Sequence, residues 1–257
     1  MLYLTIISCL SYILSAGCQA RQLFHSPQAR TSLLFRLSSF ISILCHGYLL
    51  YLLIETPNGQ NLYSLILLSL IFWLLNITIF LSVHLAKVEN LALFAYPLTT
   101  FILVLTYLYP GKTVVQTANF EGMVSHIFLS LFATSTLCLA FLQSILLGLQ
   151  NYYLRHRAPA ALLKLLPPLQ TMEGLLYVFL WLGLSCLSLA LISGIWFQAN
   201  HPELKHTPQI FLSLITWLII CTLLIGRYKL GWHLQKSVLG TTIGFALIFM
   251  SYFGTHL

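Results

Sequence analysis

Eight long apolar runs divide this chain, and no other feature limits its possible folds as strongly. A helix that rises about 1.5 Å per residue needs about 20 mostly apolar residues to cross the roughly 30 Å hydrocarbon layer of a membrane. The strands of a membrane barrel would instead show short segments of alternating polarity. The continuous runs predict a polytopic, all-α membrane helix bundle with spans near residues 1–16, 37–54, 62–83, 91–109, 126–149, 174–197, 210–226 and 238–253.

The composition agrees with a membrane protein. Of the 257 residues, 59% are hydrophobic and only 7% are charged, whereas a soluble domain carries about 25% charged residues. The polar connections between the runs are short, and none is long enough to form a separate soluble domain. We therefore predict a single transmembrane domain that occupies residues 1–257.

The positions of Lys and Arg predict which way the spans run. Of the 12 Lys and Arg residues, ten lie in the connections after the first, third, fifth and seventh runs, and only Lys112 and Lys205 lie in the others. Cytoplasmic connections of membrane proteins are enriched in Lys and Arg, so both termini are predicted to lie outside. The net charge of +7 is then a topology signal, and no nucleic-acid partner is expected.

The nine histidines are the residues with the greatest chemical potential. The predicted topology places His126, His201, His206 and His256 on the outer face, and His25, His84, His156 and His233 near the cytoplasmic face. Imidazole binds zinc, copper, nickel or haem iron, and two imidazoles from different helices can hold one haem. The chain contains no Asp, which disfavours a hydrolytic metal site and a Ser-His-Asp triad.

The ninth histidine, His46, is predicted to lie near the middle of the second span. A polar group at that depth must have a partner or face a cavity, and such residues often mark functional sites. The alternative is a histidine that is hydrogen-bonded between packed helices. The residue pattern leaves both interpretations open.

Two further features of the sequence concern packing. The six cysteines lie in or beside apolar runs without a Cys-x-x-Cys pair, which is typical of small core residues and not of a redox relay or metal site. Gly240 and Gly244 lie four residues apart in the last span. This spacing of small residues favours close packing between membrane helices.

Several segments resemble, in the same order, motifs of the small YpjD-like (CorE-like) inner-membrane proteins. Residues 124–137, VSHIFLSLFATSTL, resemble the family segment VHI.LSLFSYATL, and Cys45-His46 matches the family's CH in the second span. Five shorter motifs also resemble motifs of the family. They are GQNL at residues 59–62, LPPL at 166–169, LSLITW at 212–217, GW at 231–232 and SYFG at 251–254. The family's corresponding motifs are GQNLS, PPL, LS..AW, GW and AYFG. The resemblance covers nearly the whole chain. It implies a bacterial inner-membrane protein of the haem-handling CcsA/CcmC/HemX cytochrome c assembly superfamily.

The resemblance also implies candidate haem ligands. In the larger CcsA proteins, histidines on the outer face and within spans ligate haem, and a tryptophan-rich outer loop ending in WD presents it to apocytochrome. By position, His126 matches the outer histidine that opens the fifth span, and His46 matches a histidine within a span. His256 loosely matches the last outer histidine.

The chain departs from the family pattern at two points. Between Trp196 and Trp217, where the tryptophan-rich loop would lie, it has no Trp or Asp. The second span histidine of the CcsA proteins falls at residues 226–227, which are Gly-Arg here. Loss of the aromatic platform argues for a smaller or different task than delivery of haem to an apoprotein.

The leading hypothesis is therefore a non-enzymatic haem-handling membrane protein of cytochrome c assembly. We expect it to hold b-type haem noncovalently at its outer face through His126, with His256 or His206 as the second axial ligand. The expected partners are haem, other cytochrome c assembly proteins and membrane lipid. One alternative is a transporter or efflux factor for a small solute or divalent cation, and another is a structural scaffold that binds nothing.

Overall fold

The structure is a computed structural model that describes residues 1–25, 32–82, 89–115, 122–156, 167–200, 207–232 and 234–254. These residues form two compact units. Unit 1 contains the described residues up to Val115, and unit 2 contains those from Gly122 onwards. The single transmembrane domain over the whole chain stays a prediction.

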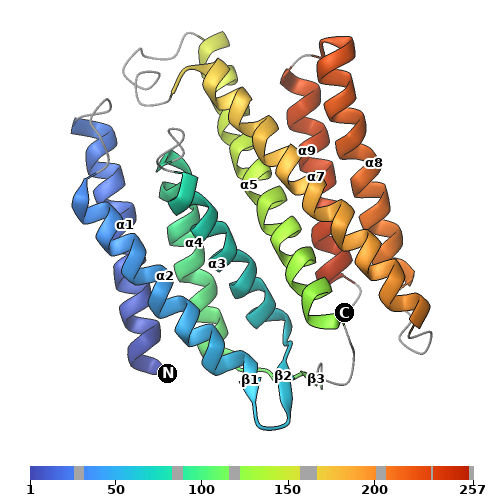
Figure 1. Cartoon of the computed structure of the whole chain (residues 1–257). Helices are drawn as coiled ribbons and strands as arrows, with labels where there is room; N and C mark the ends of the chain where they lie inside the picture. The colour runs from blue at the N-terminus through green and yellow to red at the C-terminus, as the bar shows by residue number, and fades with distance from the viewer. Residues whose placement is uncertain are drawn as a thin grey trace. The chain divides into compact units, whose positions relative to one another are not determined.

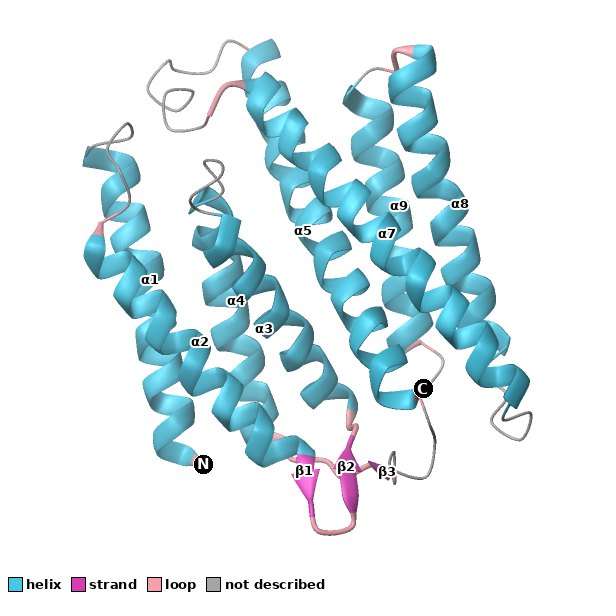
Figure 2. Ribbon diagram, viewed as in Figure 1, coloured by secondary structure: helices cyan, strands magenta, loops and turns pink. Residues whose placement is uncertain are grey.

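The described part of unit 1 consists of helices and a small sheet (Figures 1 and 2). Its elements are α1 (Leu2–His25), α2 (Leu33–Ile54), β1 (Glu55–Thr56), β2 (Gly59–Asn61), α3 (Ser64–Ser82), α4 (Glu89–Leu108) and β3 (Val114–Val115). Helix α1 packs against α2 and α4, and α3 packs against α2 and α4.

The described part of unit 2 is entirely helical. Its elements are α5 (Met123–Arg155), α7 (Leu169–Asn200), α8 (Thr207–Leu230) and α9 (Leu234–Phe253). Helix α5 packs against α7 and α9, and α8 packs against α7 and α9. The start of α5, the end of α7, the start of α8 and the end of α9 lie at the same end of this unit (Figure 1).

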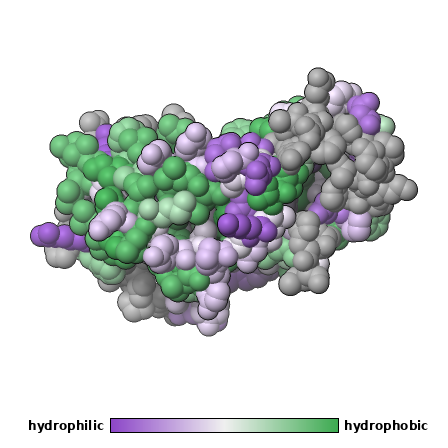
Figure 3. All heavy atoms as spheres, turned by 90° about the horizontal axis from the view of Figure 1, so that it is seen from below, coloured by the Kyte–Doolittle hydropathy of each residue, from purple (hydrophilic) through white to green (hydrophobic). Residues whose placement is uncertain are grey.

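The prediction of about eight membrane-spanning helices is confirmed. Eight of the described helices are long and apolar enough to cross a membrane, and each of the eight predicted runs falls on one of them. Hydrophobic residues cover much of the surface visible in Figure 3, and Leu10 and Ile192 are 62% and 67% exposed. Such exposure is expected when lipid is the solvent, because lipid tails are as apolar as the side chains.

The interior of unit 1 is held together by hydroxyl and amide groups. Ser15 of α1 and Ser38 of α2 lie 2.7 Å apart at their Oγ atoms. Asn76 of α3 donates to Thr99 of α4 at 2.8 Å. Because hydrocarbon offers no hydrogen-bond partners, polar groups inside a span are satisfied by neighbouring helices.

A three-stranded antiparallel sheet has the strand order β1-β2-β3. Asn61 fixes this sheet, because its side-chain amide donates to the Gly111 carbonyl at 3.1 Å and its Oδ1 accepts from the Thr113 N–H at 2.8 Å. A Cβ atom on Gly111 would overlap the Tyr63 ring. The motif GQNL at residues 59–62 therefore ties the α2–α3 connection to the segment after α4.

The predicted close packing at Gly240 and Gly244 is confirmed between α9 and α8. A Cβ atom on Gly240 would lie 2.6 Å from Cδ2 of Leu223, and one on Gly244 would lie 3.1 Å from Cδ1 of Ile220. The two glycines let the helix backbones approach within one chain. All six cysteines are free thiols. Cys138 and Cys186 are buried, as predicted for core residues, and the other four are half-buried.

Candidate functional site

His126 lies in the first turn of α5. Gly122 precedes the helix with a φ of 78°, a left-handed conformation that glycine adopts without the steric cost of a Cβ atom. The backbone N–H of His126 donates to the Gly122 carbonyl at 3.0 Å and closes the first turn. The helix start thereby fixes where the imidazole leaves the backbone.

The imidazole of His126 is oriented by Ser193 of α7. Its Nδ1 lies 3.0 Å from Ser193 Oγ, and the same hydroxyl donates to the Ala190 carbonyl at 3.0 Å. A hydroxyl has one proton to donate, so Ser193 accepts from His126 Nδ1–H. Metal-ligating histidines commonly donate their second ring N–H in this way.

Two glycines, one in α7 and one before α5, allow close packing at this end of unit 2. A Cβ atom on Gly194 would lie 2.8 Å from Cε1 of His126, so the ring packs directly against the α7 backbone. A Cβ atom on Gly122 would lie 3.1 Å from Cζ3 of Trp196. Trp196 is 55% exposed and provides an aromatic surface beside the start of α5.

The end of α9 lies beside the same part of α5. The Tyr252 side chain of α9 lies close to the side chains of Ser130 and Thr134 of α5. Ser130 is one turn after His126 and donates to its carbonyl at 2.8 Å. Ser251 donates to the Gln209 carbonyl of α8 at 3.0 Å. The starts of α5 and α8 and the ends of α7 and α9 therefore surround the His126 end of unit 2.

His46 lies in unit 1, is fully buried and has a hydroxyl at each ring nitrogen. Nδ1 lies 3.2 Å from the Tyr12 hydroxyl of α1, and Nε2 lies 3.0 Å from Ser69 Oγ of α3. A neutral imidazole has one donor and one acceptor nitrogen, and both are engaged here. Ligation of iron by His46 would require one of these bonds to break.

Among the described residues, the remaining histidines provide no further candidate ligand for iron. His156, at the opposite end of α5 from His126, is exposed and its Nδ1 donates to the Tyr152 carbonyl at 2.9 Å. The described ranges contain no group of three or more His, Cys, Asp or Glu residues that could hold a metal ion. The candidate ligands His206 and His256 lie outside the described residues, as do His84, His201, His233 and the side chain of His25.

Sequence reasoning found His126 but missed the residues that orient it. Ser193 and Gly194 lie in a continuous apolar run, where a single serine and glycine are common. The signal that could have found them is their position in the last turns of a span whose end is predicted to lie at the same membrane face as His126. Tyr12 and Ser69, which enclose His46, carried no signal beyond being polar groups within spans.

A comparison with protein families decides the assignment of the chain. The family model described as cytochrome C assembly protein matches residues 6–257. The chain belongs to the cytochrome c assembly protein family. This cytochrome c assembly protein is therefore similar to its family along almost its whole length, in both units.

The relatives of this cytochrome c assembly protein include an inner-membrane protein. The inner membrane protein YpjD of Escherichia coli K12 is 26% identical over 223 residues, which cover 86% of this chain and 84% of YpjD. Cytochrome c biogenesis proteins CcsA match over shorter segments. The CcsA of Gloeothece citriformis is 28% identical over 102 residues, which cover 39% of this chain and 31% of CcsA. The CcsA of Thermosynechococcus vestitus is 30% identical over 90 residues, which cover 34% of this chain and 28% of CcsA. No solved structure matches the chain significantly.

These findings give the coarse function and location of this cytochrome c assembly protein. The family and its CcsA relatives support a role in cytochrome c biogenesis. The similarity to an inner-membrane protein and the eight apolar helices make it a multi-pass protein of the inner membrane.

Proposed function

We propose that this protein binds b-type haem noncovalently and acts in cytochrome c assembly as a binding factor and not as an enzyme. The observation that carries the proposal is the bond from His126 Nδ1–H to Ser193 Oγ. It fixes the orientation of the imidazole at the start of α5, and imidazole is a standard haem ligand whose second ring N–H is commonly held by such a bond. Noncovalent binding is expected because the chain has no Cys-x-x-Cys pair.

His256 or His206 would supply the second axial ligand. His256 follows Tyr252 by four residues, and Tyr252 lies beside Ser130 and Thr134 of α5, one to two turns after His126. His206 immediately precedes α8, whose first turn is tied to the end of α9 through Gln209 and Ser251. Either connection thus begins or ends beside the His126 end of unit 2, which supports both histidines as candidates. Haem, when bound, would supply a redox-active iron.

The test is the absorption spectrum of the purified protein after reconstitution with haem. We expect a Soret band in the wild type and a loss of haem affinity of at least about tenfold in His126→Ala, since axial ligation supplies much of the binding. Ser193→Ala should weaken binding by about tenfold, as is typical when the hydrogen-bond partner of a ligating histidine is removed. His156→Ala, which removes an exposed imidazole at the other end of α5, is the matched control and should bind as the wild type does.

The second ligand is identified by the same measurement. Of His256→Ala and His206→Ala, one should change the spectrum from six-coordinate to five-coordinate haem. Absence of a Soret band, or a band unchanged in His126→Ala, would refute the proposal. If deletion of the protein then altered sensitivity to cobalt or magnesium while c-type cytochromes stayed normal, the cation-transport alternative would replace it.

A further inference from the structure

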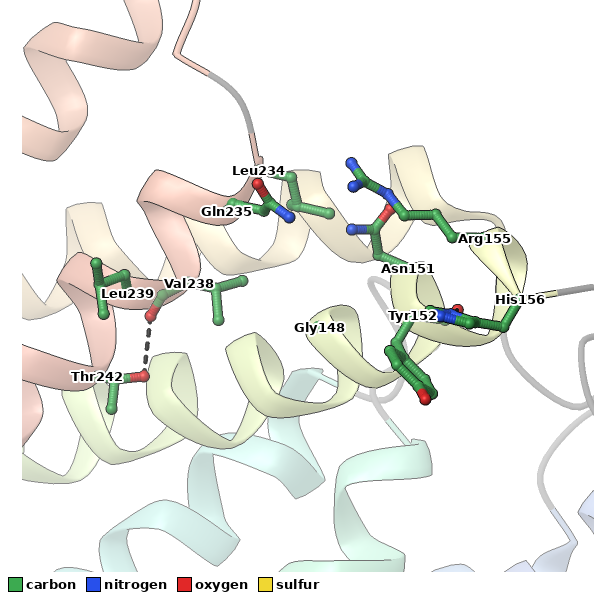
Figure 4. A pocket seen from close by; sticks show the side chains of 10 residues that line it. All are labelled: Gly148, Asn151, Tyr152, Arg155, His156, Leu234, Gln235, Val238, Leu239 and Thr242. Carbon is green, nitrogen blue, oxygen red and sulfur yellow. Dashed lines mark hydrogen bonds between the residues drawn. The ribbon is translucent and has the colours of Figure 1, made fainter. Parts of the chain in front are cut away.

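A cavity of about 450 Å³ lies in unit 2 between the last turns of α5 and the first turns of α9. Gly148, Asn151 and Arg155 line it from α5, and Gln235, Val238 and Leu239 line it from α9 (Figure 4). The cavity is about six to eight helical turns from His126 along α5, roughly 35 to 45 Å at 1.5 Å per residue. It is therefore separate from the candidate haem site.

One side of this cavity carries polar and cationic groups. In Figure 4 the guanidinium of Arg155 and the amides of Asn151 and Gln235 gather on the same side of the pocket. The guanidinium fork matches two oxygens of a phosphate, and the two amide NH₂ groups are further donors. This side of the cavity suits a phosphate ester.

The charge around Arg155 also favours an anion. The carboxylate side chains in the described part of the chain are those of Glu55 and Glu173, and Arg155 pairs with neither. Glu173 is paired instead with Arg227 at 3.0 Å. The positive charge at the cavity is thus not neutralised by a carboxylate within the described residues.

The other side of the cavity is apolar and is open at the lipid-facing surface of the helices. Val238 and Leu239 line it, and Leu239 is 62% exposed. The Thr242 hydroxyl donates to the Val238 carbonyl at 2.9 Å, which uses its proton within α9. At Gly148 the helix has no side chain, and a Cβ atom there would lie 3.6 Å from Cγ1 of Val238. Gly148, Val238 and Leu239 thus give this side of the cavity an apolar lining that suits a hydrocarbon chain.

The depth of the cavity in the membrane is that of the lipid headgroups. All the described Lys and Arg residues of unit 2 lie at this end of its helices, namely Arg155, Arg227, Lys229 and Lys236. The Lys236 ammonium lies 4.9 Å from the centroid of the Trp232 ring. Basic residues and Trp at a span end mark the membrane–water interface, and basic pockets between spans bind anionic headgroups.

We propose that this cavity binds an anionic phospholipid. Its phosphodiester lies on Arg155, Asn151 and Gln235, and one acyl chain runs along Val238 and Leu239 beside Gly148. A free phosphate would use only the polar side of the cavity, and a neutral apolar ligand would use only the other side. A phospholipid of the surrounding membrane meets both at the depth where they lie.

The test is native mass spectrometry of the purified full-length protein, titrated with phosphatidylglycerol or phosphatidylcholine. The wild type should retain one phosphatidylglycerol with higher affinity than phosphatidylcholine. Arg155→Gln should weaken phosphatidylglycerol binding by about tenfold, the usual size of a lost charge-assisted hydrogen bond. Lys229→Gln is the matched control, because it removes the same charge from the same end of unit 2 outside the cavity, and it should change binding much less.

A second variant tests the apolar half of the cavity with all charges kept. Gly148→Leu adds an apolar side chain to the lining of the cavity and should abolish retention of the lipid, whereas the exposed Arg155 change leaves the helix packing untouched. Equal losses in Arg155→Gln and Lys229→Gln would overturn the proposal in favour of diffuse surface attraction. Full binding in Gly148→Leu, no preference between the two lipids, or displacement by millimolar inorganic phosphate would overturn it as well.

Discussion

At the scale of single residues, His126 and His46 differ in what surrounds their ring nitrogens. Ser193 accepts the Nδ1 proton of His126, while Gly194 allows the ring to lie against α7. His46 is enclosed by two hydroxyls from different helices. The first arrangement orients an imidazole at the start of α5, and the second joins α1, α2 and α3.

We expect His46→Ala to destabilise unit 1. The change removes two interhelical hydrogen bonds, each worth about 0.6 kcal/mol in a membrane protein, and leaves a cavity, for a total of about 2 kcal/mol. Thermal unfolding in detergent would measure it, with His156→Ala as the exposed control. If His46→Ala instead left the unfolding midpoint unchanged and removed the Soret band, His46 would be a haem ligand.

Residue positions along one helix were predictable from the sequence, but their neighbours on other helices were not. His126 stands at the start of an apolar run, so its depth follows from counting. Its contact with Ser193 depends on how α5 and α7 are rotated about their axes, and both are apolar around most of their circumference. The cavity between α5 and α9 was unpredictable for the same reason, because Arg155 and Gln235, which both line it, are 80 residues apart in sequence.

At the scale of elements, the glycines of α9 set how closely it approaches α8. Gly240 faces Leu223, whereas Gly174, near the start of α7, would have no atom within 4 Å of an added Cβ. A glycine in a membrane helix therefore has different roles at different positions. Only a glycine such as Gly240, which faces a side chain of the neighbouring helix, allows two helices to pack closely.

We expect Gly240→Leu to destabilise unit 2 by about 1–3 kcal/mol, because overpacking forces the helices apart or side chains off their rotamers. Gly174→Leu makes the same chemical change without a steric conflict and serves as the control. Thermal unfolding of both variants in detergent would measure the difference. Equal unfolding midpoints for the two variants would contradict the importance of the close approach.

The helices themselves were largely predictable, but their ends and the sheet were not. Apolar runs identify spans because hydrocarbon sets their length. Helices α5 and α7 continue past these runs, since polar residues such as Asn151 and Gln170 are compatible with a helix in the headgroup region. Strands of two or three residues give no periodic signal, and the bonds of Asn61 join segments 50 residues apart.

At the scale of the whole molecule, the predicted orientation determines which histidines face which compartment. Ten of the 12 Lys and Arg residues lie in the odd-numbered connections, which predicts that these connections are cytoplasmic. The His126 end of unit 2 would then face outward, and the lipid cavity would lie in the cytoplasmic leaflet. Both proposals therefore depend on the same orientation for their biological context.

Reporter fusions would test this orientation. Alkaline phosphatase, which is active only outside the cytoplasm, should be active when fused after Leu257 and inactive when fused after Arg155. A fluorescent protein that folds only in the cytoplasm should give the reverse pattern. The opposite result for both reporters would invert the topology and place His126 at the cytoplasmic face.

The single proton of the Ser193 hydroxyl also has an electronic consequence. A carboxylate acceptor would pull the Nδ1 proton of His126 towards itself and give the imidazole partial anionic character, which stabilises ferric iron. A neutral hydroxyl that already donates to the Ala190 carbonyl pulls far less. Iron held by His126 would therefore have a higher reduction potential than iron held by a carboxylate-paired histidine, and would be more easily kept in the ferrous state.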